Sequence, residues 1–368
     1  MRVRSARSRD LVEQGRLLHS GRHPQKRSRR ERWAGCGGKS GGMPRHIGIE
    51  DARALVRSRE QLLDLDGSVA ALRAAVRDGS LVRLHRDAYV YADALDDLWP
   101  DGRHLVRVVA AHLGMTGGAA VMSHRSAAVL HGLAQPYLAD APVETTTIGD
   151  VRMSGRAGLR RHSDRLPDDD VVEVGGIRCT SADRTVFDVA RTCSVDVGVS
   201  CADAAARREA LCGRDFDSDA QDRWRERLLG RAVASPGRRG VVRARRVLRF
   251  ADGRAQLPGE SVSRVQLARL GFRDFELQVR VDGPGRREYF VDIGLPESRT
   301  FWEFDGEGKY AASTDGRTLE DVLLDEKRRE DWIRGVTQWR FTRGGWRDIA
   351  TPVALRARLE AFGVPLPR

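Results

Sequence analysis

The C-terminal third of the chain alternates between short apolar runs and longer amphipathic segments. Apolar residues spaced three or four apart predict helices, and strict alternation of apolar and polar residues predicts strands. The segment over 318–333 is acidic at its start and basic near its end, which suits the dipole of a helix. The pattern predicts the order α-β-β-β-α-β-α, over residues 259–270, 275–281, 288–295, 300–305, 318–333, 337–342 and 351–362.

Residues 46–98 show a second pattern, in which two short helices precede a hairpin. The helices are predicted over 59–65 and 69–76, and the hairpin over 81–91. This order predicts a winged helix-turn-helix, a fold whose second helix enters the major groove of DNA. The predicted DNA contacts are the basic residues of that helix and of the wing, namely Arg73, Arg77, Arg83 and Arg86. The alternative is a structural helix and hairpin that does not touch DNA.

Residues 99–252 are predicted to form a middle domain of mixed helices and strands, without a catalytic constellation. Arg184 and Asp188 lie four residues apart on a predicted helix, so we interpret them as a structural ion pair. His124 and His131 fall on another predicted helix. Their small apolar neighbours favour packing over metal binding.

Composition and charge narrow the possible partners. The chain has 368 residues, enough for two or three domains, with a formal charge of +12 and a sequence pI near 10.2. Residues 1–45 hold 13 basic against 3 acidic side chains, whereas residues 46–368 hold 51 against 49. Nucleic-acid binding by the folded part must therefore come from local basic patches and not from a global field.

Residues 1–45 are rich in Arg, Ser and Gly and lack hydrophobic periodicity, which predicts disorder. The segment is either a basic arm that follows DNA phosphates or an over-extended start with Met43 as the true initiator, and we favour the second interpretation. It lacks the apolar core of a signal peptide, and no run in the chain approaches a membrane span. Five cysteines without a Cys-x-x-Cys pair argue against a zinc ribbon or a disulfide framework and fit a cytoplasmic protein.

Acidic residues gather at the ends of two predicted strands near residue 300. Glu303 and Asp305 are two apart and would point to one side of their strand, and pairing with the preceding strand would add Asp292. Three like charges in one place are costly unless a cation neutralises them, and Mg²⁺ (or Mn²⁺) is a natural partner of carboxylate oxygens. Acidic residues are also common at strand ends and in turns, and Asp305 precedes a glycine.

Residues 258–365 resemble the PD-(D/E)XK nuclease superfamily, and within it the branch similar to very-short-patch-repair (Vsr-like) endonucleases. The matching segments are Pro258-Gly259-Glu260-Ser261, Val291-Asp292, Trp302-Glu303-Phe304-Asp305-Gly306, Asp325-Glu326-Lys327-Arg328-Arg329-Glu330-Asp331 and Trp339-Arg340-Phe341. The resemblance implies that Asp292 and Glu303 bind the metal ion. It also implies a further carboxylate, Glu260, from the first helix.

This chain departs from the superfamily's Glu-x-Lys motif, because the residue two after Glu303 is Asp305. Lys309 is the candidate for the missing lysine, since only four lysines occur among the 64 basic residues. An ammonium group there could orient the attacking water or stabilise the phosphate in the transition state. Lys327 and Arg328, on the next predicted helix, are candidates for DNA contact.

Histidines are confined to the first half of the chain, since none follows His162. Catalysis in the C-terminal part must therefore rest on carboxylates, metal and Lys or Arg. An idle nuclease fold that only binds DNA is the competing interpretation.

The N-terminal part resembles AbiEi-type antitoxins, which are regulators from type IV toxin–antitoxin systems. The matching segments are Leu81-Val82-Arg83, Ala88-Tyr89-Val90, Ser123-His124-Arg125-Ser126-Ala127-Ala128 and Leu130-His131-Gly132-Leu133. Asp87 stands where the family tends to place a glycine in the wing turn. The resemblance implies binding to operator DNA and a cognate toxin as a possible partner.

These patterns predict an α+β multidomain protein with a winged helix (46–98), a mixed α/β middle domain (99–252) and a PD-(D/E)XK-type domain (253–368). The predicted function is that of a metal-dependent DNA endonuclease. Its predicted catalytic residues are Glu260, Asp292, Glu303, Asp305 and Lys309. The alternative is a non-catalytic regulator or antitoxin whose nuclease fold is idle.

Overall fold

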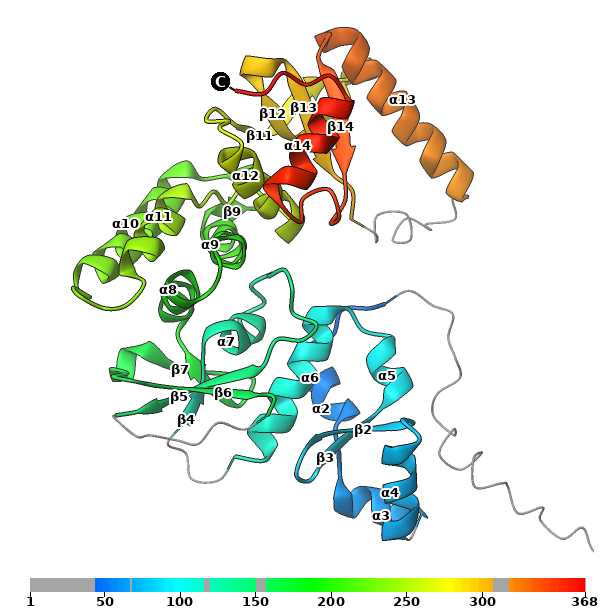
Figure 1. The fold of residues 1–368 in the computed structure, drawn as a ribbon, viewed down its shortest axis with the longest axis vertical. Coiled ribbons are helices and arrows are strands. Elements are labelled where there is room, and N and C mark those ends of the chain that lie inside the picture. Colours follow the sequence, from blue (N-terminus) through cyan, green and yellow to red (C-terminus); the bar gives the residue numbers. More distant parts are fainter. Residues whose placement is uncertain (1–43, 67, 116–119, 150–156, 307–317, 368) are drawn as a thin grey trace, which may run out of the picture. The chain divides into compact units, whose positions relative to one another are not determined.

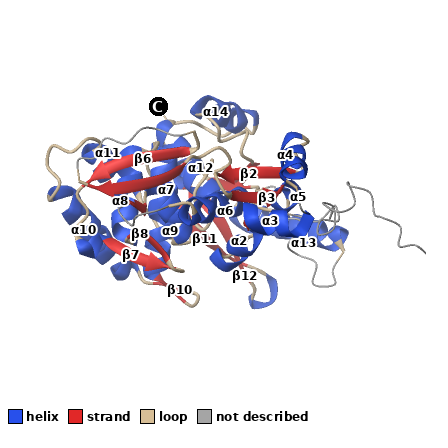
Figure 2. Cartoon of the chain, turned by 90° about the horizontal axis from the view of Figure 1, so that it is seen from below, coloured by secondary structure: helices blue, strands red, loops and turns tan. Residues whose placement is uncertain are grey.

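The computed structural model describes residues 44–66, 68–115, 120–149, 157–306 and 318–367. The predicted basic segment 1–45 therefore lies almost wholly outside the described residues. The described chain folds into helices and several separate sheets (Figure 1), and Figure 2 shows the helices in blue and the strands in red. These sheets have three, five, two and four strands. The prediction of an α+β protein is confirmed at this level.

The N-terminal part contains a small antiparallel sheet of order β1-β3-β2. Its elements are α2 (Ile49–Leu55), β1 (Arg57–Ser58), α3 (Arg59–Asp66), α4 (Val69–Arg77), β2 (Leu81–His85), β3 (Ala88–Tyr91) and α5 (Ala92–Asp96). Ser68 begins α4 because its hydroxyl accepts a hydrogen bond from the backbone N–H of Ala71 at 3.1 Å. The predicted helix pair and hairpin are confirmed, and α2, β1 and α5 are additions to the prediction.

The middle part is built on a five-stranded mixed sheet of order β6-β5-β4-β8-β7. Its strands are β4 (Ala120–Met122), β5 (Val143–Ile148), β6 (Leu159–Asp164), β7 (Val171–Val174) and β8 (Ile177–Thr180). Its helices are α6 (Pro100–Leu113), α7 (His124–Leu130), α8 (Ala182–Thr192), α9 (Val195–Ala210), α10 (Ser218–Val233) and α11 (Val241–Phe250). A hairpin of β9 (Leu211–Cys212) and β10 (Asp215–Phe216) joins α9 to α10. Neither this hairpin nor α10 was predicted.

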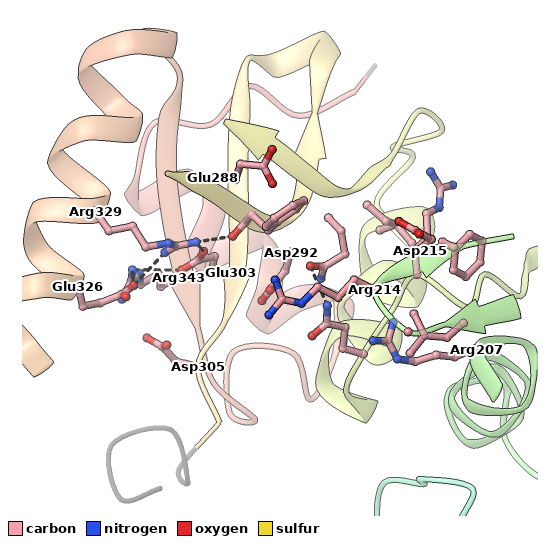
Figure 3. A pocket seen from close by; sticks show the side chains of 18 of the residues that line it. Arg207, Arg214, Asp215, Glu288, Asp292, Glu303, Asp305, Glu326, Arg329 and Arg343 are labelled. Carbon is pink, nitrogen blue, oxygen red and sulfur yellow. Dashed lines mark hydrogen bonds and ion pairs between the residues drawn. The ribbon is translucent and has the colours of Figure 1, made fainter. Parts of the chain in front are cut away.

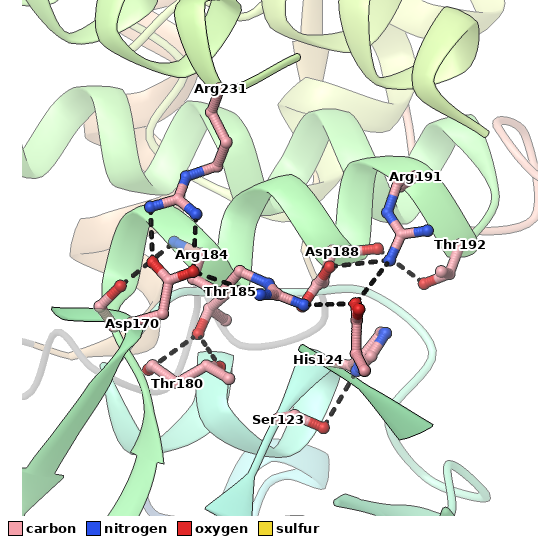
Figure 4. A network of polar contacts seen from close by, with 12 residues as sticks. Ser123, His124, Asp170, Thr180, Arg184, Thr185, Asp188, Arg191, Thr192 and Arg231 are labelled. Atoms are coloured by element: carbon pink, nitrogen blue, oxygen red, sulfur yellow. Dashed lines mark hydrogen bonds and ion pairs between the residues drawn. The ribbon is translucent and has the colours of Figure 1, made fainter. Parts of the chain in front are cut away.

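A buried polar network joins α8 to the sheet (Figure 4). Arg184 is 3% exposed and donates hydrogen bonds to Asp188 at 2.7 Å, to Asp164 at 2.6 Å and to Asp170 at 3.2 Å. Arg231 from α10 holds the same Asp170 with two hydrogen bonds of 2.9 and 2.6 Å. The structural interpretation of Arg184 and Asp188 is confirmed, because a buried guanidinium is held here by three carboxylates.

The C-terminal part has a four-stranded sheet of order β11-β12-β13-β14. Its elements are α12 (Pro258–Arg269), β11 (Glu276–Asp282), β12 (Glu288–Leu295), β13 (Thr300–Phe304), α13 (Leu319–Thr337), β14 (Arg340–Gly344) and α14 (Pro352–Ala361). The first three strands are antiparallel, and β14 runs parallel to β13 after the α13 crossover. The predicted α-β-β-β-α-β-α order is confirmed, with boundaries shifted by a few residues.

The two faces of β13 pack against different helices. Trp302 and Phe304 lie in a core with residues of α12 and α14, whereas Phe301 packs with Ile333 of α13. Glu303 alternates with Trp302 and Phe304 along β13. Because the side chains of a strand alternate with a period of two residues, Trp302 and Phe304 lie on one face of the sheet and Glu303 on the other, as predicted.

Helix α12 connects the C-terminal sheet to the middle part. Its residue Val265 belongs to the core around α9, while Val262 belongs to the core of the sheet. Gly259 allows the close approach to the sheet, because a Cβ there would overlap the ring of Phe304. The middle and C-terminal parts are therefore packed together through this shared helix.

Among the described residues, no helix combines the length and the apolar character needed to cross a lipid bilayer.

Candidate functional site

A cavity of about 1120 Å³ lies at the four-stranded sheet and contains most of the predicted catalytic residues. Figure 3 shows charged side chains that approach it from the sheet, from α13 and from the β9–β10 hairpin. Its acidic lining residues are Asp215, Glu288, Asp292, Glu303, Asp305 and Glu326. Its basic lining residues are Arg207, Arg214, Arg254, Arg329 and Arg343. Such a mixed lining can bind a polyanion and a cation next to each other.

Asp292 and Glu303 are neighbours on adjacent strands. The pairing of β12 with β13 matches Ile293 to Trp302, so the next pair in this antiparallel register is Asp292 and Glu303. One oxygen of Asp292 accepts a hydrogen bond from the backbone N–H of Phe304 at 2.9 Å. The prediction that the strand meander brings Asp292 beside Glu303 is confirmed. Asp305 follows directly after β13 and lines the same cavity.

Glu303 is 3% exposed and lies between two arginines. Arg329 Nη2 lies 2.5 Å from one of its carboxylate oxygens, and Arg343 Nη2 lies 3.1 Å from the other. Burial raises the pKa of Glu303 above its ordinary value, the two guanidinium groups oppose that shift, and the charge of Asp292 adds to it. The net shift is upward, so burial dominates at this carboxylate.

Helix α13 contributes one face to the cavity. Val322, Glu326 and Arg329 all line it, and their spacing of four and three residues places them on the same side of the helix. Glu326 accepts a hydrogen bond from Arg329 at 3.0 Å and pairs closely with Arg343. Two guanidinium groups therefore bridge two carboxylates.

Arg329 and Arg343 were not among the predicted site residues, although both line the cavity. Arg329 follows Lys327 and Arg328 in sequence, but its helical spacing from Val322 and Glu326 places it at the cavity. Arg343 is matched to Glu303 in the parallel register of β13 and β14. No local sequence signal reveals that pairing, because the two residues lie on different strands.

Glu260 does not line the cavity itself but contacts two residues that do. It is 3% exposed and is not among the residues that line it. Its carboxylate accepts hydrogen bonds from the backbone N–H of Gln256 at 2.9 Å and from the side chain of Gln278 at 3.4 Å. Both glutamines line the cavity, so Glu260 is linked to the site through them.

The remaining C-terminal predictions have different outcomes. Lys309 lies outside the described residues. Lys327 and Arg328 are exposed on α13, and neither lines the cavity with Asp292 and Glu303. Arg328 pairs with Asp325 at 3.5 Å on the helix surface. These two cations are therefore not gathered with the carboxylates.

The carboxylates at this site have the donor chemistry that Mg²⁺ or Mn²⁺ prefers. Across the described ranges, however, no three His, Cys, Asp or Glu side chains are grouped closely enough to hold a metal ion. Mg²⁺ commonly takes one or two carboxylates and completes its coordination with waters and substrate phosphate oxygens. The neighbouring Asp292 and Glu303, with Asp305 close to them in sequence, fit such a substrate-completed site.

A second, smaller cavity of about 420 Å³ lies on the N-terminal part. It is lined by five arginines from α3, α4 and the β2–β3 hairpin, namely Arg59, Arg73, Arg77, Arg83 and Arg86. Arg83 donates hydrogen bonds to the backbone oxygens of His85 at 3.2 Å and Arg86 at 2.9 Å, which fixes the hairpin turn. The four predicted DNA-binding residues of this part therefore share one basic surface.

His124 and His131 each have a partner within the middle part. His124 is 2% exposed, and its ring stacks on that of His162 with centroids 3.7 Å apart. His131, just after α7, lies 2.7 Å from the backbone oxygen of Thr180 through its Nε2. The two histidines are engaged with different partners, as expected for packing residues.

Acid is expected to destabilise the middle part through His104 and His124. Burial lowers the pKa of each to about 4, and nearby Arg125 contributes for His104. The unfolded chain titrates near the ordinary value of about 6.5, so it binds more protons than the native state between pH 6.5 and 4. Stability is fully present above pH 6.5 and should fall across this window by at most roughly 3 kcal/mol per histidine. Urea denaturation at pH 7 and pH 5 measures this fall in the free energy of unfolding. The variant His124→Asn should show a smaller fall. Equal stability of the wild type at both pH values would contradict the prediction.

The comparisons with known proteins add relatives but no activity. No family model matches the chain. The chain is 28% identical over 274 residues to the uncharacterized protein MT2308 of Mycobacterium tuberculosis (strain CDC 1551 / Oshkosh), covering 69% of this chain and 90% of that protein. The uncharacterized protein Rv2248 of Mycobacterium tuberculosis (strain ATCC 25618 / H37Rv) shows the same identity and coverage.

Proposed function

We propose that the protein is a metal-dependent DNA endonuclease with a Vsr-like PD-(D/E)XK domain and a winged-helix DNA-binding domain. The observation that carries this proposal is the pair Asp292 and Glu303, placed side by side at the end of a four-stranded sheet and facing a charged cavity. The order of helices and strands around them supports the proposed superfamily. The basic surface of the N-terminal part supports DNA as the substrate.

The proposed reaction is hydrolysis of a DNA phosphodiester. A bound Mg²⁺ or Mn²⁺ ion would supply charge neutralisation and an activated water. Asp292 and Glu303 would hold the ion, with Asp305 assisting directly and Glu260 indirectly through Gln278. The three carboxylates that line the cavity would thus act at the ion, and Glu260, which does not line it, would act through its neighbour.

Cations of the site would stabilise the phosphate. Arg329 and Arg343 lie against Glu303, so their charge is available where negative charge accumulates on the reacting phosphate. Both are held by Glu326 as well, which limits their movement. These arginines place two guanidinium groups at the site without involving Lys309, although Glu303 and Glu326 offset part of their charge.

The test of this function is nicking of a supercoiled plasmid by purified full-length protein. Cleavage should occur with Mg²⁺ or Mn²⁺ and stop with EDTA. DNA binding without cleavage in either metal would contradict the enzymatic proposal.

The second candidate is a non-catalytic regulator or antitoxin of the AbiEi type, with DNA and a cognate toxin as partners. One observation favours it: both carboxylate oxygens of Glu303 are engaged by arginines. An ion pair of this kind can serve structure alone. Under this proposal the basic surface of the N-terminal part carries the function.

Arg73→Glu is expected to lower DNA affinity by at least about tenfold, because it replaces a phosphate-binding cation with an anion. Arg73 is exposed on α4 within the basic surface, whereas Arg246 is exposed on α11 and lines neither cavity. Arg246→Glu makes the same charge change and should have little effect. Fluorescence anisotropy with labelled duplex DNA at fixed salt measures both, and equal losses would indicate a non-specific effect of net charge.

A further inference from the structure

The wall of the cavity that faces the sheet comes from the middle part of the chain. It includes the end of α9 and the β9–β10 hairpin, which contribute Arg207, Arg214, Asp215 and Phe216. Figure 3 shows Arg214 extending from this hairpin into the cavity that also holds Asp292. The nuclease-like resemblance begins at residue 258, so it does not account for this wall.

The wall is fixed in place by buried contacts. Arg264 of α12 pairs with Asp203 of α9 at 2.9 Å, and both side chains are at least 95% buried. Asp203 also accepts a hydrogen bond from the backbone N–H of Asp252 at 2.8 Å. A Cβ at Gly253 would overlap the backbone of Arg207, so these segments are in close contact. The α9 end and its hairpin are therefore held at a defined position beside the sheet.

The two arginines of the wall differ from the others at the cavity. Arg329, Arg343 and Arg254 are each paired with a carboxylate. Among the described residues, Arg214 is exposed and has no hydrogen bond or ion pair. The side chain of Arg207 donates a single hydrogen bond within the described residues, to the backbone oxygen of Gly253 at 3.4 Å. Two cations are thus left without a carboxylate partner at the edge of a carboxylate-lined cavity.

The positive charges of Arg207 and Arg214 attract an anion that enters the cavity. Asp215 offsets part of the charge, because it lies next to Arg214 on the same hairpin. Phe216 adds an aromatic side chain to the wall, which suits contact with a sugar or a base. A polynucleotide provides both the phosphates and the apolar groups that this wall can bind.

We propose that Arg207 and Arg214 bind backbone phosphates of a nucleic-acid strand next to the reacting phosphodiester and position that strand over Asp292 and Glu303. This inference rests on the proposed nuclease function for the identity of the site. It adds a positioning surface from outside the nuclease-like segment. The strand lies between the wall and the sheet, with its charge neutralised from both sides.

The test compares Arg207→Ala, Arg214→Ala and the charge-conserving Arg214→Lys in the full chain. Binding to a labelled duplex is measured in EDTA, where cleavage cannot contribute, and cleavage is measured separately with Mg²⁺. Each alanine variant should weaken binding by about tenfold and reduce the salt dependence of binding by about one phosphate contact. KM should rise more than kcat falls, and Arg214→Lys should retain most of the affinity.

Arg246→Ala is the matched control, since Arg246 is also an exposed arginine but lines neither cavity, so its replacement should leave binding unchanged. The same variants are then compared in a chain that also carries Arg73→Glu, so that DNA binding by the N-terminal part is reduced. If the wild type cleaves DNA and both alanine variants behave like the control, the inference fails and the nuclease function stands. If the wild type does not cleave but the alanine variants bind weakly, the nuclease function fails and the phosphate-binding wall stands.

Discussion

Asp292→Asn is expected to lower the rate of DNA cleavage by about 10³-fold or more while DNA affinity stays within about threefold. Asparagine keeps the shape of the side chain, and its amide oxygen can still accept the 2.9 Å hydrogen bond from the backbone of Phe304. What it loses is the negative charge that would hold a metal ion beside Glu303. Plasmid nicking under single-turnover conditions measures the rate, and titration with Mn²⁺ measures metal binding independently of cleavage.

Glu288→Gln is the matched control for this variant. Glu288 lies on the same strand, lines the same cavity and pairs with Arg280 at 2.9 Å on the outer part of the sheet. The control removes one carboxylate charge from the cavity without changing the predicted ligands, so cleavage should stay within about threefold. Equal losses in both variants would show that total charge and not a ligand at Asp292 controls the reaction. Unchanged cleavage by Asp292→Asn would remove this residue from the proposed site.

Arg184→Met is expected to lower the free energy of unfolding by about 3–5 kcal/mol. The guanidinium of Arg184 is the shared partner of Asp164, Asp170 and Asp188, and its removal leaves buried negative charges with fewer counterions. Methionine retains an unbranched, mostly apolar stem that reaches as far as the Nε position of arginine, so the stem's packing is largely kept while the charge is lost. Urea denaturation monitored by circular dichroism measures the change.

Arg227→Met is the control for the buried network. Arg227 pairs with Asp183 at 2.6 Å, but its side chain is 48% exposed. An exposed pair of this kind contributes at most about 1 kcal/mol. If both variants lost the same small amount of stability, the buried network would not be the structural connection proposed between α8 and the sheet.

The carboxylates of the site were predictable because their signals are local. Strand alternation places the side chain of Glu303 on the opposite face of the sheet from those of Trp302 and Phe304. The short connection between the two strands brings Asp292 next to Glu303. The arginines beside Glu303 were not predictable in the same way. Arg343 reaches it only through the parallel pairing of β13 and β14, which the α13 crossover creates.

Sequence alone determined the order of helices and strands in the C-terminal part, the helix pair and hairpin of the N-terminal part, and the carboxylates near residue 300. These features depend on periodicity and capping within a few residues, and such information is carried by neighbours along the chain. The tertiary structure decided which charges meet. It brought the β9–β10 hairpin to the cavity and turned Arg329 toward Glu303, because α9 and α13 pack against elements that are distant in sequence. Long-range packing has no periodic signal in the chain, so only the folded structure shows these contacts.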